Sequence, residues 1–121
     1  MLCCPICHQR ACLRCGAHPV AACCPAPQAV AAQPTVVVID VDQGFQDYSG
    51  GVYQSSTCDA TTVNHAVVAV GYSVQGGWWK LRNSWGRSWG EAGYIRVPML
   101  SNAKGFCGMY LFGGWFPSAV A

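Results

Sequence analysis

The chain has 121 residues, of which 52% are hydrophobic and 10% charged, with a formal net charge of +2 at pH 7. This length allows at most one modest domain. The few basic residues are dispersed, and no apolar run approaches the ~18–20 residues that cross a membrane. We therefore expect neither a nucleic-acid partner nor a membrane partner.

The first 30 residues differ in composition from the rest of the chain. They hold seven of the nine cysteines and four prolines, show no helical or strand periodicity, and lack the uninterrupted apolar stretch of a signal peptide. Two Cys-x-x-Cys pairs are typical of zinc sites, so a zinc site is an alternative interpretation. Only His8–Ala11 separates Cys7 from Cys12, whereas zinc ribbons use roughly a dozen to twenty residues. We expect residues 1–30 to be irregular, either disordered or non-native, and to bind no metal or other cofactor.

The next part of the chain predicts a strand, a helical turn and a loop. Thr35–Val41 is a β-branched run with apolar residues on both faces of the expected strand. We therefore expect this strand to be buried on both faces. A single helical turn is predicted over Phe45–Tyr48, ended by Gly50 and Gly51. A short strand and a polar loop carrying Cys58 follow.

The C-terminal part predicts further strands. A second long strand over His65–Val74 and a strand over Trp78–Asn83 form a hairpin through the glycine pair between them. A glycine-rich loop leads to a strand over Tyr94–Val97, and Cys107–Phe112 is expected to be the last strand. Because no stretch keeps a period of 3.6 residues, the sequence predicts a mainly antiparallel β domain over residues 31–121, with at most one or two short helices.

Two polar residues stand at strand ends of the predicted hairpin. His65 is the only histidine outside the N-terminal segment, and Asn83 ends the strand that pairs with it. Each residue alone is unremarkable, since histidine beside an apolar strand and asparagine at a turn are both common. The hairpin register, however, brings the start of one strand beside the end of the other. Trp85 and Trp89 follow directly, where their rings could screen such a pair from water.

The segments NHAVVAVGY and WWKLRNSWGRSWGEAGYIRV closely resemble the C-terminal half of papain-like cysteine peptidases. The flanking segments AQPTVVVIDVDQGFQDYSGGVY and FCGMYLFGGWFPSA extend the resemblance, the latter to a plant-type C-terminus, so that it covers about Gln28–Ala119. It implies the barrel-like β half of the α+β papain fold, thiol-dependent proteolysis of peptide or protein substrates, and no cofactor. Family members of this kind are usually secreted, vacuolar or lysosomal.

The resemblance also implies roles for individual residues. His65 matches the catalytic histidine and Asn83 the asparagine that orients its imidazole. Trp85 matches the ring that covers this pair, and Trp89 a ring on the leaving-group side. The pocket that selects the substrate side chain is implied for Val38, Val63, Ala66 and Phe112.

A disulfide is implied in the same way. Cys58 and Cys107 match a disulfide pair, which would contribute roughly 3–4 kcal/mol through loop closure. Two free thiols are the alternative if the chain stays in a reducing compartment.

The nucleophile of the family has no counterpart in these 121 residues. Its signature C-G-[SA]-C-[WY] lies roughly 130–150 residues before the histidine. The nearest imitation, Cys15–His18, has histidine in the nucleophile's place and lies far closer to His65. We expect the chain alone to be inactive, because a thiolate is the attacking group. The face that should meet a helical half would be exposed and prone to self-association.

Four interpretations follow from these observations. The first is a truncated papain-like peptidase. The second is a pseudo-peptidase binding module that pairs with or regulates another papain-like chain. The third is a metal-binding protein that uses its N-terminal cysteines. The fourth is an ordinary thiol protease whose residues 1–27 are misassigned.

Overall fold

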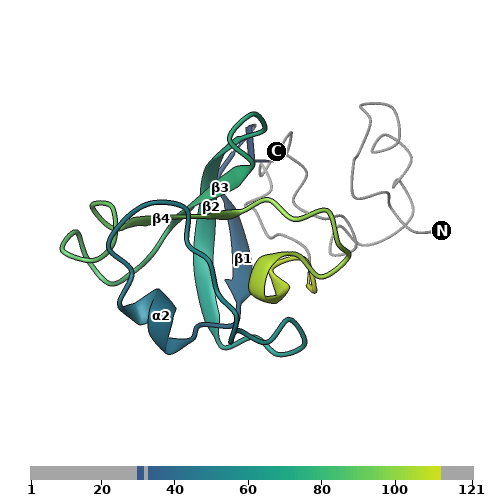
Figure 1. Cartoon of the computed structure of the whole chain (residues 1–121). Helices are drawn as coiled ribbons and strands as arrows, with labels where there is room; N and C mark the ends of the chain where they lie inside the picture. The colour runs from purple at the N-terminus through teal and green to yellow at the C-terminus, as the bar shows by residue number, and fades with distance from the viewer. Residues whose placement is uncertain (1–29, 32, 113–121) are drawn as a thin grey trace, which may run out of the picture.

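The computed structural model describes residues 30–31 and 33–112 (Figure 1). They form one four-stranded antiparallel sheet in the order β1-β2-β3-β4. The elements are β1 (Thr35–Ile39), α2 (Gln43–Gln46), β2 (His65–Ser73), β3 (Trp78–Arg82), β4 (Tyr94–Pro98) and the 3-10 helix η3 (Phe106–Gly108). The predicted β2–β3 hairpin and the mainly antiparallel β class are confirmed.

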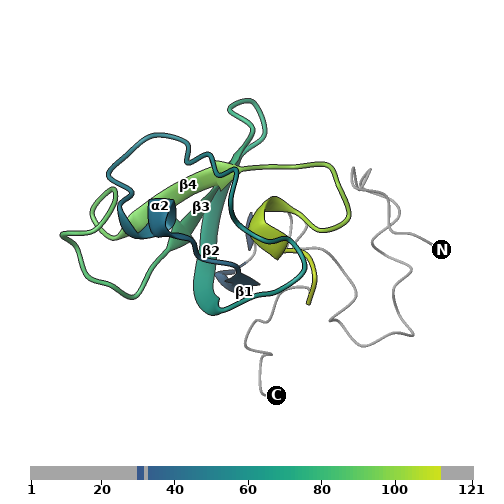
Figure 2. The ribbon, with the colours of Figure 1, turned by 60° about the horizontal axis from the view of Figure 1, so that its bottom comes forward.

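The hydrophobic core lies on one face of this sheet. Alternate residues of each strand are buried, as in β3, where Trp79 is 2% and Leu81 0% exposed, whereas Lys80 and Arg82 are exposed. Figures 1 and 2 show α2 and η3 on the same side of the sheet, where Phe45, Phe106 and Met109 complete the core. The other face of the sheet carries no helix among the described residues.

The prediction that β1 is buried on both faces was wrong. Val37 and Ile39 are fully buried, whereas Val36 is 36% exposed and Val38 is half-buried. The reason is that the core of the described residues lies on one face of the sheet, so only one face of β1 meets it. Apolar residues on both faces of β1 therefore do not mean that both faces of the strand are buried.

The chain between β1 and β2 differs from the prediction in detail. The helical turn begins two residues earlier than expected, because the Asp42 carboxylate caps it by accepting a hydrogen bond from the Phe45 N–H at 2.9 Å. The short strand predicted before Cys58 is reduced to one parallel bridge between Val52 and Arg96.

The prediction of a last strand over Cys107–Phe112 was also wrong. Phe106–Gly108 forms the 3-10 helix η3 and turns follow it. Gly105 and Cys107 have φ angles of 71° and 48°, and backbone in this left-handed region cannot continue a strand. Local backbone geometry therefore overrides the apolar pattern of this segment.

The implied disulfide is present. Cys58 and Cys107, 49 residues apart, are bonded with a Cα–Cα distance of 5.4 Å. The bond ties the polar loop before β2 to η3. The other seven cysteines and the expectation of an irregular segment over residues 1–30 lie outside the described residues, apart from Val30. No helix among the described residues is long and apolar enough to cross a membrane.

The carboxylate of Asp42, like the disulfide, connects segments that are distant in the sequence. Besides the Phe45 N–H, it accepts hydrogen bonds from the hydroxyls of Tyr53, Ser55 and Thr57. Partial burial acts to raise the pKa of Asp42, but these four hydrogen bonds outweigh it and hold the pKa well below its ordinary value. Burial and the bond to Asp42 raise the pKa of Tyr53 to about 12.

Removing the disulfide should lower the free energy of unfolding by roughly 3–4 kcal/mol, because the bond closes a loop of 49 residues in the unfolded chain. The measurement is urea unfolding of the Cys58→Ser/Cys107→Ser variant, in a background whose seven N-terminal cysteines are serine so that thiol exchange cannot occur. Each single variant should lose as much as the double one. An unchanged urea midpoint would contradict the expectation.

Asp42→Asn should lower the free energy of unfolding at pH 7 by roughly 1–3 kcal/mol, because an amide NH₂ then faces hydroxyl donors. Since the folded pKa of Asp42 is depressed, its stabilisation is complete above the ordinary pKa of 3.8 and is lost as the pH falls further. The difference between wild type and variant should therefore shrink from pH 4 to pH 2. Asp47→Asn, at an exposed carboxylate on the same turn, serves as the control.

Candidate active site

His65 and Asn83 meet at the open end of the β2–β3 hairpin. His65 is the first residue of β2 and Asn83 directly follows β3. The antiparallel pairing of these strands brings the two side chains together, with His65 Nε2 2.8 Å from Asn83 Oδ1. A histidine and an asparagine 18 residues apart thus form one hydrogen-bonded pair.

The asparagine oxygen is fixed by a second hydrogen bond. Asn83 is 6% exposed, and its Oδ1 also accepts the backbone N–H of Ser84 at 2.8 Å. An oxygen held in this way can only accept from the imidazole, which favours the tautomer with its proton on Nε2. Nδ1 then remains as the basic nitrogen of the His65 ring. The amide nitrogen Nδ2 of Asn83 is buried without a hydrogen-bond partner among the described residues.

Aromatic rings surround the pair on the core side. The rings of His65 and Trp85 lie 5.0 Å apart at 34°, so Trp85 partly covers the imidazole. Phe45 of α2 contacts this layer edge-on, at 6.3 Å from His65 and 5.7 Å from Trp85. Trp89 packs on Phe45 at 5.1 Å, and its Nε1 donates to the backbone carbonyls at the end of α2. Trp85, Phe45 and Trp89 thus form one aromatic layer beside the His65 imidazole.

The loop that carries both tryptophans is closed by an ion pair. Arg96 donates to both carboxylate oxygens of Glu91 at 2.8 Å. The hydrogen bonds from Arg96 lower the pKa of Glu91 to about 2, against the opposing effect of burial. Tyr48 also donates to Glu91, at 2.9 Å, and this network ties the loop to β4 and to the chain after α2.

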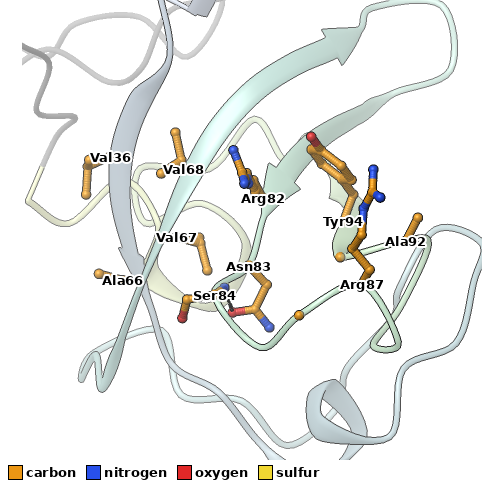
Figure 3. Close-up of a pocket in the computed structure, with 12 residues that line it drawn as sticks. Val36, Ala66, Val67, Val68, Arg82, Asn83, Ser84, Arg87, Ala92 and Tyr94 are labelled. Atoms are coloured by element: carbon orange, nitrogen blue, oxygen red, sulfur yellow. Dashed lines mark hydrogen bonds between the residues drawn. The ribbon is translucent and has the colours of Figure 1, made fainter.

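The four residues expected to form a substrate pocket lie at three places in the described domain. Val38 and Ala66 are cross-strand partners in β1 and β2, next to the His65 end of the sheet. Val63 is half-buried, and Phe112 is 49% exposed. A cavity of about 570 Å³ opens beside Asn83, and Ala66 is the only one of the four that lines it (Figure 3). Their assignment to one pocket stays a prediction.

Sequence reasoning missed the residues that line this cavity on its polar side. Arg82, Arg87 and Tyr94 lie there together with Asn83 (Figure 3). The alternation in Trp78–Arg82 already placed Arg82 on the face opposite Trp79 and Leu81. The loop residue Arg87 carried no such signal.

Metal-ligating side chains do not cluster in the described part of the chain. Residues 30–31 and 33–112 contain no group of three or more His, Cys, Asp or Glu side chains that could hold a metal ion. The Cys-x-x-Cys pairs that raised a zinc site lie outside these residues.

Comparisons with known proteins agree on one family. The family model described as papain family cysteine protease matches residues 20–111. A cathepsin L-like proteinase of Fasciola hepatica is 51% identical over 81 residues, which are 65% of this chain and 24% of that protein. The chain spans about a quarter of the length of the curated relatives it matches.

Solved structures show the same likeness. The bromelain protease of Ananas comosus, determined with the E64 inhibitor, matches with a TM-score of 0.60 and 41% identity, over 69% of this chain and 40% of that one. The cysteine protease CMS1MS2 of Carica candamarcensis, in complex with E-64, matches with a TM-score of 0.61 and 37% identity, over 73% and 39%.

Phe45→Ala should lower the free energy of unfolding by about 3–5 kcal/mol, because a ring 1% exposed is replaced by a cavity between α2 and the tryptophans. The measurement is urea unfolding, with near-ultraviolet circular dichroism to follow the order of the tryptophans. Phe45→Leu should lose less and keep the fold. The control is Phe112→Ala, at a ring 49% exposed, with a change below about 0.5 kcal/mol. Equal losses at positions 45 and 112 would contradict this account of the aromatic layer.

Proposed function

The chain belongs to the papain family of cysteine proteases, and we propose that its described domain supplies the acid–base half of a peptidase active site. The observation that carries this proposal is the hydrogen bond between His65 Nε2 and Asn83 Oδ1. It leaves Nδ1 as the ring nitrogen that can exchange a proton with a thiol. Trp85 supports the role by partly covering the imidazole, and Trp89 packs against Trp85.

The proposed chemistry moves one proton between a thiol, the imidazole and the leaving group. Nδ1 of His65 takes the thiol proton, which gives a thiolate and an imidazolium. The thiolate attacks the carbonyl carbon of the peptide, and the imidazolium gives its proton to the departing amine. Water then hydrolyses the thioester after His65 removes its proton, and the thiol is regenerated. Asn83 holds the ring in one orientation through these steps.

The thiol itself has to come from outside the described domain. The domain contains two cysteines, and both are used in the Cys58–Cys107 disulfide. The 121 residues contain no C-G-[SA]-C-[WY] signature. We therefore propose that these residues alone hydrolyse no peptide, and that cleavage requires a helical half-domain that supplies the cysteine.

A second candidate function is a binding module without proteolysis. The sheet face opposite the core carries partly exposed apolar residues, including Val36 at 36% exposure. This face favours association, either with a papain-like partner chain or with a second copy of this chain. The pocket role of Val38, Val63, Ala66 and Phe112 belongs to the peptidase proposal, supported by the pairing of Val38 with Ala66 near His65.

The peptidase proposal is tested by complementation. The full chain alone should release no product from a fluorogenic peptide. Mixed with the part of the Ananas comosus bromelain protease that it does not match, it should cleave the peptide. His65→Ala should then lower kcat/KM by at least ~10²-fold, because general acid–base catalysis is lost. Lys104→Ala, at an exposed residue, is the matched control and should have no effect.

Two outcomes would contradict the peptidase proposal. Cleavage that survives His65→Ala would remove the assigned acid–base role. Cleavage by the chain alone that disappears when the seven N-terminal cysteines become serine would locate the nucleophile within these residues. Stable association without cleavage would instead support the binding module.

A further inference from the structure

The residue that precedes His65 is held against the end of β1 by its own side chain. Asn64 Oδ1 accepts the backbone N–H of Val41 at 2.8 Å, and Asn64 Nδ2 donates to the Val41 carbonyl at 3.3 Å. The same Nδ2 donates to a carboxylate oxygen of Asp40 at 2.8 Å. The backbone N–H of Asn64 donates to the carbonyl of Ile39 at 3.0 Å. Both the main chain and the side chain of this neighbour therefore hold the backbone from which the imidazole projects.

The carboxylate of Asp40 connects Asn64 to two other segments. One oxygen accepts the hydrogen bond from Asn64, and the other accepts the backbone N–H of Asp59. The backbone N–H of Asp40 donates to the carbonyl of Cys107 at 2.9 Å. Because Asp59 directly follows Cys58, Asp40 bonds to the chain at both ends of the disulfide. Through Asp40, the Asn64 amide is therefore connected to the segments that the disulfide cross-links.

The span of these hydrogen bonds distinguishes Asp40 from the neighbouring carboxylate of Asp59. The Asp59 side chain is exposed and accepts hydrogen bonds from Thr61 and Thr62, two and three residues further along the chain. The Asp40 carboxylate instead bonds to residues 19 and 24 positions away. Asp59 thus stabilises its own turn, whereas Asp40 stabilises the start of another strand. That strand is β2, which begins at His65.

The imidazole needs support from its own backbone because the hydrogen bond to Asn83 holds only one ring atom. Nε2 of His65 lies 2.8 Å from Asn83 Oδ1, whereas Nδ1 is the nitrogen that exchanges a proton in the proposed reaction. A ring fixed at one atom can still pivot about that atom. His65 is also the first residue of its strand, and the ends of elements open locally at a low cost in free energy. The position of Nδ1 therefore depends on how firmly the preceding residue is held.

We propose that Asp40 is a positioning residue for His65 and that it acts through Asn64. The inference rests on the proposed function, in which the imidazole has to meet a thiol at a fixed place. The Asp40 carboxylate fixes the Asn64 amide, and that amide holds the backbone at the start of β2. Nδ1 then keeps its place among the reacting groups, where a displacement of ~1 Å can cost about 10²-fold in rate.

The first experiment observes the imidazole directly, by nuclear magnetic resonance of the full chain alone. His8→Gln and His18→Gln leave His65 as the only histidine. Asp40→Ala should speed the exchange of its Nε2 proton with water at least ~10-fold, because the ring hydrogen bond opens more easily. Asp59→Asn, at the exposed neighbouring carboxylate, is the matched control and should change this rate less than ~2-fold.

The path through Asn64 is tested by combining substitutions. Asn64→Ala should also speed the exchange, and adding Asp40→Ala to it should cause no further increase, because Asp40 has then lost the group through which it acts. Asp40→Asn keeps the shape of the side chain and one acceptor oxygen. It should give an intermediate exchange rate, and it serves as the second variant should Asp40→Ala not fold. Circular dichroism and urea unfolding confirm that each variant is folded when it is measured.

The complementation assay adds a kinetic readout. Asp40→Ala should lower kcat about tenfold and leave KM within about twofold, because the place of Nδ1 matters in the transition state rather than in substrate binding. The kcat is expressed per titrated active site, so that a merely structural role, which reduces only the amount of folded enzyme, leaves it unchanged. Asp59→Asn should leave kcat unchanged.

Three results would overturn the positioning role: equal exchange in wild type and Asp40→Ala, equal effects of Asp40→Ala and Asp59→Asn, or fully additive effects of Asp40→Ala and Asn64→Ala. The assays also separate this inference from the proposed function. Cleavage that depends on His65 but not on Asp40 refutes the positioning role and keeps the peptidase. Faster exchange in Asp40→Ala, with no cleavage by any mixture, keeps the positioning of the imidazole and refutes the peptidase.

Discussion

The register between β2 and β3 determines which side chains meet in this protein. It places Val68 opposite Arg82 and brings His65 within 2.8 Å of Asn83. A shift of one residue would turn Trp79 and Leu81 toward the solvent face and the charged residues toward the core. The bulge between Ala69 and Gly71 is part of this arrangement, because it sets the pairing at the end of the hairpin away from His65.

The hydrogen bonds of Asp42 connect the candidate site to the rest of the fold. Asp42 collects four hydrogen bonds and caps α2, so it fixes both the helix and the loop that leads to Cys58. α2 in turn presents Phe45 to the rings around His65, and Trp89 donates back to its carbonyls. The orientation of the imidazole thus depends on a chain of polar and aromatic contacts that begins at a single carboxylate.

Among the described residues, one face of the sheet is covered by other elements and the other face is not. The core face is closed by α2, η3 and the disulfide, whereas the outer face keeps Val36 partly exposed, and in the described part of the chain Asn83 Nδ2 has no acceptor. Natural interiors rarely leave such donors unsatisfied. The chain belongs to the papain family and spans about two-fifths of the length of the two solved plant relatives.

The sequence by itself determined the four strands of the sheet, the hairpin turn, the family and the pairing of a histidine with an asparagine, because alternation, glycine turns and long motifs are local signals. Only the tertiary structure decided that β1 is buried on one face, that η3 replaces a strand, and that Asp42 joins hydroxyls 11 to 15 residues away. It also decided that Arg82 and Arg87 line one cavity with Asn83, whose side-chain nitrogen has no hydrogen-bond partner among the described residues. Burial and hydrogen-bond partners depend on elements far apart in the chain, and no local pattern encodes them.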